Sequence, residues 1–356
     1  MNASSGVVTF KISPDQAATS PPEHRGLRRD DIRLLVARPS RVEHRRFTEL
    51  PDILEPGDLL VINTSGTLPA AVDASGRAGA VHVSTALDDG CWVVELRRGD
   101  NRGPDQSLRP GEWLELAGGV RLEVLNPYPR AGLRSTRLWR ARPTGVVDLV
   151  AYLRRYGRPI SYRYLDAQYP ITAYQTVYAA TPGSAEMPSA GRPFSEALLV
   201  RLMARGITVA PIVLHAGVSS PESHEPPFPE RYEVSPVTAR LVNSALAAGD
   251  RVIAVGTTVV RALETCTTPD GIVHAGRGWT DLVLNPDRPS RVVTGLISGL
   301  HEPGASHLKL LEAVVGPDLV RSAYRAAVDH SYLWHEFGDS TVFLPDRQST
   351  PERAIR

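Results

Sequence analysis

The sequence predicts an α/β protein that carries a small all-β domain as an insertion, and three observations support this fold class. An unbroken apolar run over 59–62, bounded by turn residues, is typical of a strand buried on both faces of a sheet. Residues 66–143 show only short alternating stretches between Gly, Pro and Asp turns, with no helical period. From about residue 144 onward, helix patterns and apolar strands alternate again.

The first segment is expected to form a strand, a short helix and a second strand. These elements cover 32–37, 47–54 and 59–62, and a Pro-Gly-Asp turn at 56–58 introduces the last of them. In the inserted segment, alternating stretches at 80–84, 91–96 and 120–124 predict strands. Either a barrel or a sandwich fits this pattern.

After residue 144 the chain is expected to return to helices that alternate with strands. The helices cover 146–156, 195–206 and 238–248, and the strands cover 207–214 and 251–255. One face of the second helix carries Leu198, Leu199, Leu202 and Met203, and Gly206 follows as a stop signal.

Composition and charge limit the classes of protein to which the chain can belong. Of the 356 residues, 42% are hydrophobic and 22% charged, as in an ordinary soluble globular protein. No apolar run approaches the ~20 residues that span a bilayer, and residues 1–20 lack the apolar core of a signal peptide. We therefore expect a cytoplasmic protein without a membrane partner. Cys91 and Cys266 have no CxxC spacing, which argues against a disulfide framework or a cysteine-based zinc site.

The net charge of +1 gives tRNA binding no support, although a local arginine patch is compatible with the same total. Proteins that bind nucleic acids usually carry a strong basic excess, because phosphate neutralisation supplies much of their affinity. The sequence also lacks a GxSxG elbow, a Walker A loop and a GxGxxG after a strand. These absences argue against common hydrolases, P-loop enzymes and Rossmann dehydrogenases.

The best-placed local motif is the turn Gly256-Thr257-Thr258, between a buried strand and a helix that runs to 264. Bare backbone N–H groups at a helix N-terminus, beside a glycine that permits close approach, form a site for an anion or carboxylate. The two threonine hydroxyls can bond the same ligand. The alternative is that one threonine only caps the helix, and spacing does not distinguish the two.

A second motif is the polar and aromatic run over 173–179, followed by small residues and prolines up to Gly191. Tyrosine and glutamine side chains can stack on a nucleobase and hydrogen-bond to it. A half-buried strand followed by a tight turn explains the same pattern, and the local sequence favours that simpler interpretation.

Three histidines lie beside apolar segments. His215 ends a predicted strand, where an α/β sheet commonly presents side chains to a ligand. His301 follows another apolar run, and His307 comes six residues later. A lone histidine is more often structural than functional. The His301 and His307 pair lacks the i,i+4 spacing that places two metal ligands on one helix face, so no metal site is predicted.

Seven segments, in the same order, resemble the S-adenosylmethionine:tRNA ribosyltransferase-isomerases of queuosine biosynthesis. They are PGDLLVINT at 56–64, YQTVYA at 174–179, PSAG at 188–191, LHAG at 214–217, RVIAVGTTVVRALE at 251–264, LHEP at 300–303 and FGD at 337–339. Together they span nearly the whole chain, and the segments around Tyr174 and Gly256 are the most specific. The chain is identified as a divergent member of that family.

The resemblance implies a fold and an activity. The fold is a barrel-like α/β domain over 1–65 and 144–356, with a β-barrel domain inserted at 66–143. The activity transfers and isomerises the ribosyl part of S-adenosylmethionine onto a 7-aminomethyl-7-deazaguanine in tRNA, which yields epoxyqueuosine, adenine and methionine. S-adenosylmethionine is then a co-substrate, and neither a metal nor a redox cofactor is required.

The resemblance also implies roles for individual residues. The sulfonium acidifies the adjacent ribose 5′ hydrogens, so that a positioned base can remove one. The candidates for proton transfer are His215, His301 and Glu230. The turn at Gly256 with Arg261 is expected to bind the methionine carboxylate or a phosphate. Substrate-binding residues are expected at Asn63, Thr64, Tyr174, Gln175, Thr176, Tyr178, Ser189, Ala190, Gly191, Gly217, Gly256, Thr257, Thr258 and Arg261.

Several loops depart from the family pattern. Where relatives read PTAGLHF, this chain has PSAGRPF at 188–194, which removes a histidine, and the stretch at 227–230 keeps only Glu230. The predicted buried strands and helices match the family pattern well. This combination is typical of a protein that retains the family fold but has an altered site. Two alternatives to the family reaction follow. One is a related enzyme that uses a small-molecule acceptor, and the other is a catalytically silent paralogue that binds RNA or a nucleotide.

Overall fold

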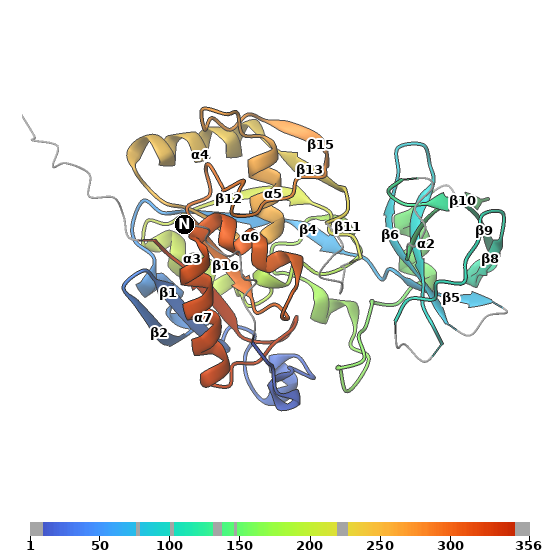
Figure 1. Cartoon of the computed structure of the whole chain (residues 1–356), viewed down its shortest axis with the longest axis horizontal. Coiled ribbons are helices and arrows are strands. Elements are labelled where there is room, and N and C mark those ends of the chain that lie inside the picture. Colours follow the sequence, from blue (N-terminus) through green and yellow to red (C-terminus); the bar gives the residue numbers. More distant parts are fainter. Residues whose placement is uncertain are drawn as a thin grey trace, which may run out of the picture.

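The structure is a computed structural model in two parts, a larger α/β part and a smaller barrel beside it (Figure 1). It describes residues 10–75, 79–99, 103–130, 137–145, 148–218 and 227–345. The predicted α/β class with an inserted all-β barrel is confirmed.

The larger part is built on a nine-stranded sheet with the order β15-β13-β12-β3-β14-β16-β17-β1-β2. In chain order these strands are β1 Arg33–Arg38, β2 Arg41–Arg46, β3 Leu59–Asn63, β12 Thr208–Leu214, β13 Glu230–Val234, β14 Val252–Val255, β15 Gly276–Thr280, β16 Gly295–Gly299 and β17 Ser340–Phe343. Strand β3 pairs in parallel with β12 and β14, and all five of its residues are buried, as the apolar run predicted.

Helices cover both faces of this sheet. They are α1 Leu50–Ile53, α3 Glu196–Ala204, α4 Pro236–Ala248, α5 Thr257–Thr265, α6 Ser306–Val315 and α7 Pro317–Asp329. Leu59 and Val61 of β3 pack in one core with α4 to α7, whereas Leu60 and Ile62 pack in another with α1 and α3. This alternation explains why the strand reads as a continuous apolar run. Among the described residues, no helix is long and apolar enough to cross a membrane.

The smaller part is a closed antiparallel barrel with the order β10-β7-β6-β5-β8-β9, which decides between the barrel and the sandwich. Its strands are β5 Ala71–Ser75, β6 Ala80–Ala86, β7 Trp92–Leu96, β8 Trp113–Leu116, β9 Val120–Pro127 and β10 Leu138–Thr144. Helix α2, Leu149–Tyr156, packs Tyr152 and Leu153 into the barrel core, and the Tyr152 hydroxyl donates to the Ala117 carbonyl. The barrel's packing thus continues past residue 143, because an apolar helix face does not reveal which sheet it will cover.

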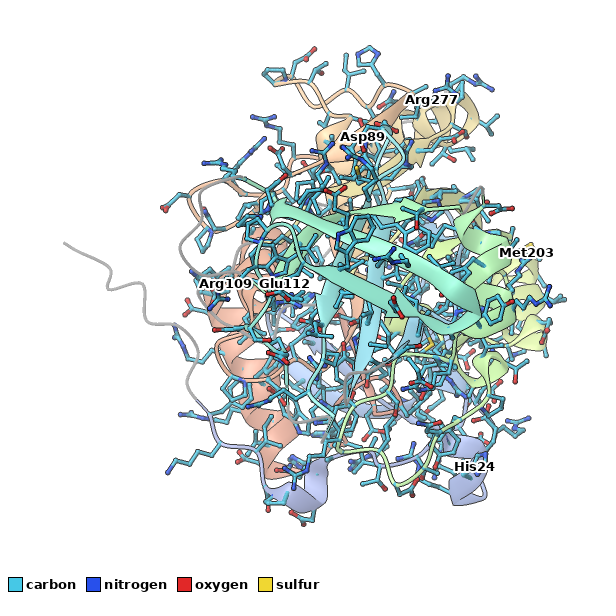
Figure 2. The ribbon with its side chains drawn as sticks, turned by 90° about the vertical axis from the view of Figure 1, so that its right-hand side faces the viewer. His24, Asp89, Arg109, Glu112, Met203 and Arg277 are labelled. Atoms are coloured by element: carbon cyan, nitrogen blue, oxygen red, sulfur yellow. The ribbon has the colours of Figure 1, made fainter. Side chains whose placement is uncertain are left out.

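Several contacts connect the parts, among them a strand pair and a contact at a hairpin. The short strands β4, Ser65–Thr67, and β11, Thr181–Ser184, pair in parallel where the chain leaves and re-enters the larger part. At the β6–β7 hairpin, Asp88 accepts hydrogen bonds from the Trp279 indole of the edge strand β15 (2.8 Å) and from Arg231 of the neighbouring strand β13. In the view from the barrel side, Asp89 of this hairpin and Arg277 of β15 both lie in the upper part of the molecule (Figure 2).

Candidate active site

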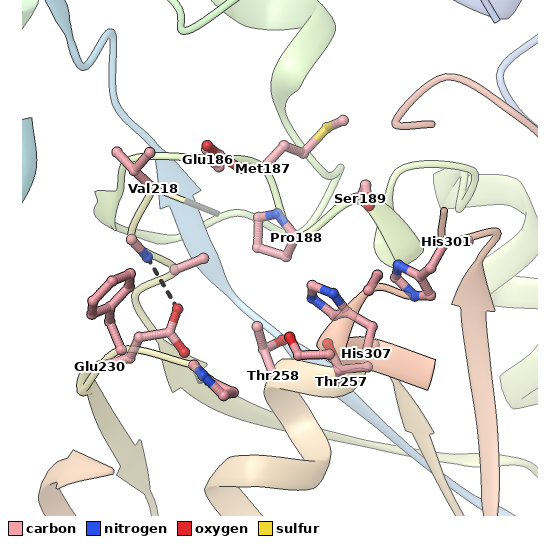
Figure 3. Close-up of a pocket in the computed structure, with 18 of the residues that line it drawn as sticks. Glu186, Met187, Pro188, Ser189, Val218, Glu230, Thr257, Thr258, His301 and His307 are labelled. Atoms are coloured by element: carbon pink, nitrogen blue, oxygen red, sulfur yellow. Dashed lines mark hydrogen bonds between the residues drawn. The ribbon is translucent and has the colours of Figure 1, made fainter. Parts of the chain in front are cut away.

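A cavity of about 900 Å³ lies where the barrel faces the carboxyl ends of the parallel strands. Its walls come from β6, residues 215–218 after β12, the start of β13, the beginning of α5 and the segments 162–164, 186–190, 298–310 and 335–336. In Figure 3, Glu230 and Val218 lie on one side of the cavity and His301 and His307 on the other. The start of α5, with Thr257 and Thr258, lies between them.

Ten of the predicted site residues line this cavity, and seven do not. The lining residues are Ser189, Ala190, His215, Gly217, Glu230, Gly256, Thr257, Thr258, Arg261 and His301. The residues outside the lining are Asn63, Thr64, Tyr174, Gln175, Thr176, Tyr178 and Gly191. The cavity thus gathers residues from four of the segments singled out in the sequence.

The N-terminus of α5 opens on the cavity. Gly256 is its N-cap residue with φ +93°, and its own N–H donates to the Ile297 carbonyl of β16. Within the described chain no side chain caps this helix, so the simple capping interpretation of Thr257 or Thr258 does not apply. Instead the Thr258 hydroxyl accepts a 3.3 Å hydrogen bond from Asn63 at the end of β3. Asn63 therefore supports the turn from behind.

Glu230 and Arg261 form a buried ion pair on one wall. The Glu230 carboxylate also accepts from the Gly217 N–H at 3.1 Å. All three guanidinium nitrogens of Arg261 donate hydrogen bonds. Nη1 donates to Glu230, Nε to the Leu282 carbonyl, and Nη2 to the carbonyls of Phe228 and Thr280. Burial raises the pKa of Glu230, although Arg261 and the Gly217 N–H oppose that shift. Arg261 thus holds the wall in place.

His215, at the end of β12, belongs to a chain of hydrogen bonds. Its Nδ1 lies 2.7 Å from the Ser65 hydroxyl, which lies 2.6 Å from the Ser184 hydroxyl, and Ser184 accepts from the Ala216 N–H. A Cβ on Gly183 would come within 2.4 Å of the imidazole ring, so a glycine is needed there. Burial and the charge of Arg231 lower the pKa of His215, which keeps the ring neutral near pH 7.

His301 and His307 stack on each other with ring centroids 4.4 Å apart and planes 3° apart. The His301 Nε2 lies 2.8 Å from the Ser298 hydroxyl, and the backbone N–H of His301 donates to the Tyr324 hydroxyl. Burial and the neighbouring His307 lower the pKa of His301 well below its ordinary value. Burial and Arg261 lower the pKa of His307 to about 4. Both rings are therefore neutral near pH 7, so that each carries one unprotonated imidazole nitrogen.

A row of aromatic side chains on another wall had no counterpart in the sequence predictions. The Tyr164 ring stacks on His335 with centroids 4.0 Å apart, and Tyr162 lies 5.9 Å from Tyr164 with the ring planes 13° apart. The Tyr162 hydroxyl donates to Glu186 and the Tyr164 hydroxyl to Glu336. The one sequence signal was the alternation Tyr162-Arg163-Tyr164, which presents two rings beside an exposed arginine.

Glu336 gives a prediction for stability against pH. Burial raises its pKa from 4.5 to about 7, so the folded state binds a proton that the unfolded chain releases. This contribution is fully present below pH 4.5 and is lost as the pH rises through 7. Relative to Glu336→Gln, the wild type should lose about 2–3 kcal/mol of unfolding free energy between pH 4.5 and 8. Urea unfolding of both proteins at the two pH values measures this loss. A difference in unfolding free energy that is the same at pH 4.5 and 8 would contradict the prediction.

Residues 174–178 do not line the cavity and pack behind its wall. Tyr174 is buried against Phe337, and the Gln175 amide bonds both the N–H and the carbonyl of Thr67 in β4. Thr64 likewise bonds the Ile212 carbonyl through its N–H and hydroxyl. These contacts join the loop to the sheet, which is a structural use of the polar side chains.

Gly191 should tolerate no side chain. A Cβ there would lie 2.1 Å from the Tyr178 hydroxyl and 3.0 Å from its ring carbon Cζ. We expect Gly191→Ala to cost about 1–3 kcal/mol of unfolding free energy through overpacking. Adding Tyr178→Phe should recover part of this loss. Gly299→Ala, where a Cβ would meet nothing within 4 Å, is the control in urea unfolding. Equal stability of the two single variants would argue against the close contact.

Among the described residues, no group of three or more His, Cys, Asp or Glu side chains is placed to hold a metal ion.

Comparison with known proteins places the chain in a family. Residues 7–343 match the family described as queuosine biosynthesis protein. An S-adenosylmethionine:tRNA ribosyltransferase-isomerase of Moorella thermoacetica is 34% identical, over 94% of this chain and 98% of its own. The namesake from Thermus thermophilus is 35% identical with the same coverage. The crystal structure of an S-adenosylmethionine tRNA ribosyltransferase from Thermotoga maritima superposes with a TM-score of 0.51 at 28% identity, covering 95% of this chain and 99% of that one.

The match extends over both parts of the molecule and includes the segments that form the cavity. This chain belongs to the queuosine biosynthesis protein family.

Proposed function

We propose that this protein transfers and isomerises the ribosyl part of S-adenosylmethionine onto a 7-aminomethyl-7-deazaguanine in tRNA. The products are epoxyqueuosine, adenine and methionine. The observation that carries the proposal is one cavity in which neutral His301 and His307 face the open N-terminus of α5 (Figure 3). Proton removal needs a neutral base, and the methionine carboxylate needs a site for an anion.

The start of α5 is the proposed site for the methionine carboxylate. Its first backbone N–H groups carry partial positive charge, and the hydroxyls of Thr257 and Thr258 stand beside them. Gly256 leaves room for close approach of a ligand. We assign Arg261 to a positioning role, since its guanidinium already bonds Glu230 and three carbonyls.

His301 is the proposed base that removes the acidified ribose 5′ proton. If its Nε2–H donates to Ser298, the Nδ1 lone pair is the basic one. The stacked His307 fixes the plane of the ring. Glu230 is less suited to this step, because its carboxylate already binds Arg261 and the Gly217 N–H.

His215 is proposed to hydrogen-bond the departing adenine. If Ser184 donates to Ser65 and Ser65 donates to Nδ1, the neutral ring carries its proton on Nε2. An N–H donor of this kind stabilises negative charge that develops on a leaving nitrogen. The acceptor amine then adds to the ribosyl fragment that adenine has left, and ring closure by a ribose oxygen forms the epoxide and expels methionine.

The tRNA acceptor rests on the names of the relatives, which give no support to the small-molecule alternative. A tRNA substrate also suggests that the protein works in the cytoplasm.

The direct test measures adenine and methionine released from S-adenosylmethionine by the purified protein. Samples contain tRNA with 7-aminomethyl-7-deazaguanine at the wobble position, the same tRNA with guanine there, or the free modified base. Release only with the modified tRNA, in step with epoxyqueuosine, is expected. Release with the free base alone would favour a small-molecule acceptor. No release in any sample would contradict the proposed reaction.

A further inference from the structure

The aromatic wall of the cavity has no part in the chemistry assigned above. Tyr162, Tyr164 and His335 form a row of nearly parallel rings, and each of them lines the cavity. The Glu336 carboxylate, which accepts from the Tyr164 hydroxyl, lines it as well. This combination requires a ligand that is flat, rich in hydrogen-bond donors and compatible with a carboxylate.

We infer that Tyr162, Tyr164 and Glu336 form the subsite for the acceptor base, with the rings stacked on it and Glu336 accepting from its N1–H and 2-amino groups. This inference rests on the proposed function. A carboxylate has two oxygens with about four acceptor positions, of which the Tyr164 hydroxyl takes one. A guanine-type edge offers two adjacent donors to such a group.

The adenine of S-adenosylmethionine fits this wall less well. Its Watson–Crick edge has a single donor, the 6-amino group, beside the acceptor N1, so an ionised carboxylate can bond the amino group but faces a lone pair at N1. The methionine carboxylate would be repelled by Glu336, whereas the start of α5 attracts it. The ammonium of an aminomethyl group, in contrast, gains from the same negative charge. We therefore expect the acceptor base to bind at the aromatic wall and the methionine part of S-adenosylmethionine to bind at the start of α5.

The location also suits a base that arrives on a polynucleotide. Arg163 lies between the two tyrosines in the chain, is exposed and contributes to the cavity lining. An exposed arginine beside stacking rings is the usual pairing of phosphate and base contacts in proteins that bind single-stranded nucleic acid.

The test compares free 7-aminomethyl-7-deazaguanine with its analogue that lacks the 2-amino group, by calorimetric binding at pH 8. That pH lies above the value of about 7 to which burial raises the pKa of Glu336. We expect the wild type to prefer the amino compound by about tenfold and Glu336→Gln to lose this preference. Tyr164→Leu should weaken both compounds, and Tyr164→Phe should restore most of the stacking. Binding of S-adenosylmethionine should stay within about twofold in all three variants.

Glu123→Gln is the matched control, because Glu123 pairs with Arg142 on the barrel surface and does not line the cavity. Weaker S-adenosylmethionine binding in Glu336→Gln, with base preference intact, would overturn the inference and assign the wall to adenine. No measurable binding of the free base to the wild type would also overturn it. Binding with the expected preference, but without turnover on modified tRNA, would contradict the proposed reaction and leave the subsite supported.

Discussion

Replacing His301 with glutamine is expected to lower adenine release from S-adenosylmethionine by about 10²–10⁴-fold, the usual contribution of a general base. Glutamine is similar in reach and can keep the hydrogen bond to Ser298, but it cannot accept a proton near neutral pH. Affinity for S-adenosylmethionine should change little, so the loss should appear in kcat. Single-turnover assays with modified tRNA separate these two quantities.

The chain contains a matched control for this variant. His44 also packs against a second histidine, His330, with ring centroids 3.9 Å apart and planes tilted by 33°, and its Nδ1 lies 3.0 Å from the Tyr332 hydroxyl. It does not line the cavity. His44→Gln should therefore leave the rate unchanged. A His301→Gln variant that keeps more than about a tenth of the activity would rule out the base assignment.

The pH profile gives the same assignment a second readout. Only neutral His301 can act as a base, and its pKa is lowered by burial and by His307 well below the ordinary 6.5. Lowering the pH through 6.5 therefore leaves the base form intact. The acid limb of kcat/KM should lie below that value in the wild type. An acid limb near 6.5 or above would contradict a buried neutral base.

Much of the larger part could be predicted because its signals are local. The run at 59–62 lies in β3 between two parallel partners, and the Gly-Thr-Thr turn opens α5 as expected. Strand β2, Arg41–Arg46, was not predicted, since only Val42 among its six residues is apolar and the strand lies at the sheet edge. Because most side chains of this edge strand are exposed to solvent, its sequence does not show the alternation of apolar and polar residues that predicts a strand.

The site was harder to predict, because its contacts join distant segments. Tyr164 and Glu336 are 172 residues apart, and no spacing rule connects them. His301 and His307 lack helix spacing, yet the turn before α6 brings their rings together. The departures from the family pattern lie at 188–194 and 227–230, and both stretches contribute to the cavity lining. A histidine lost at 188–194 leaves the histidines on 215, 301, 307 and 335 in the cavity lining.

The largest loss of stability is expected for Arg261→Met. Arg261 and Glu230 have side chains only 6% and 15% exposed, so methionine leaves a nearly buried carboxylate without its cation. Three carbonyls, of Phe228, Thr280 and Leu282, lose their donors as well. Breaking a buried pair in this way typically costs about 3–5 kcal/mol. Urea unfolding should show this loss, and activity should fall because the wall that carries Glu230 moves.

A second substitution separates charge burial from lost packing. Glu230→Gln in the Arg261→Met background removes the unpaired charge, so the double variant should be more stable than Arg261→Met alone. Arg321→Met is the control, because Arg321 and its partner Asp318 are 55% and 91% exposed and such pairs contribute about 0–1 kcal/mol. If Arg261→Met were as mild as this control, the ion pair would not hold the wall. Glu230 would then again be a candidate for proton transfer, because its carboxylate would not be committed to Arg261.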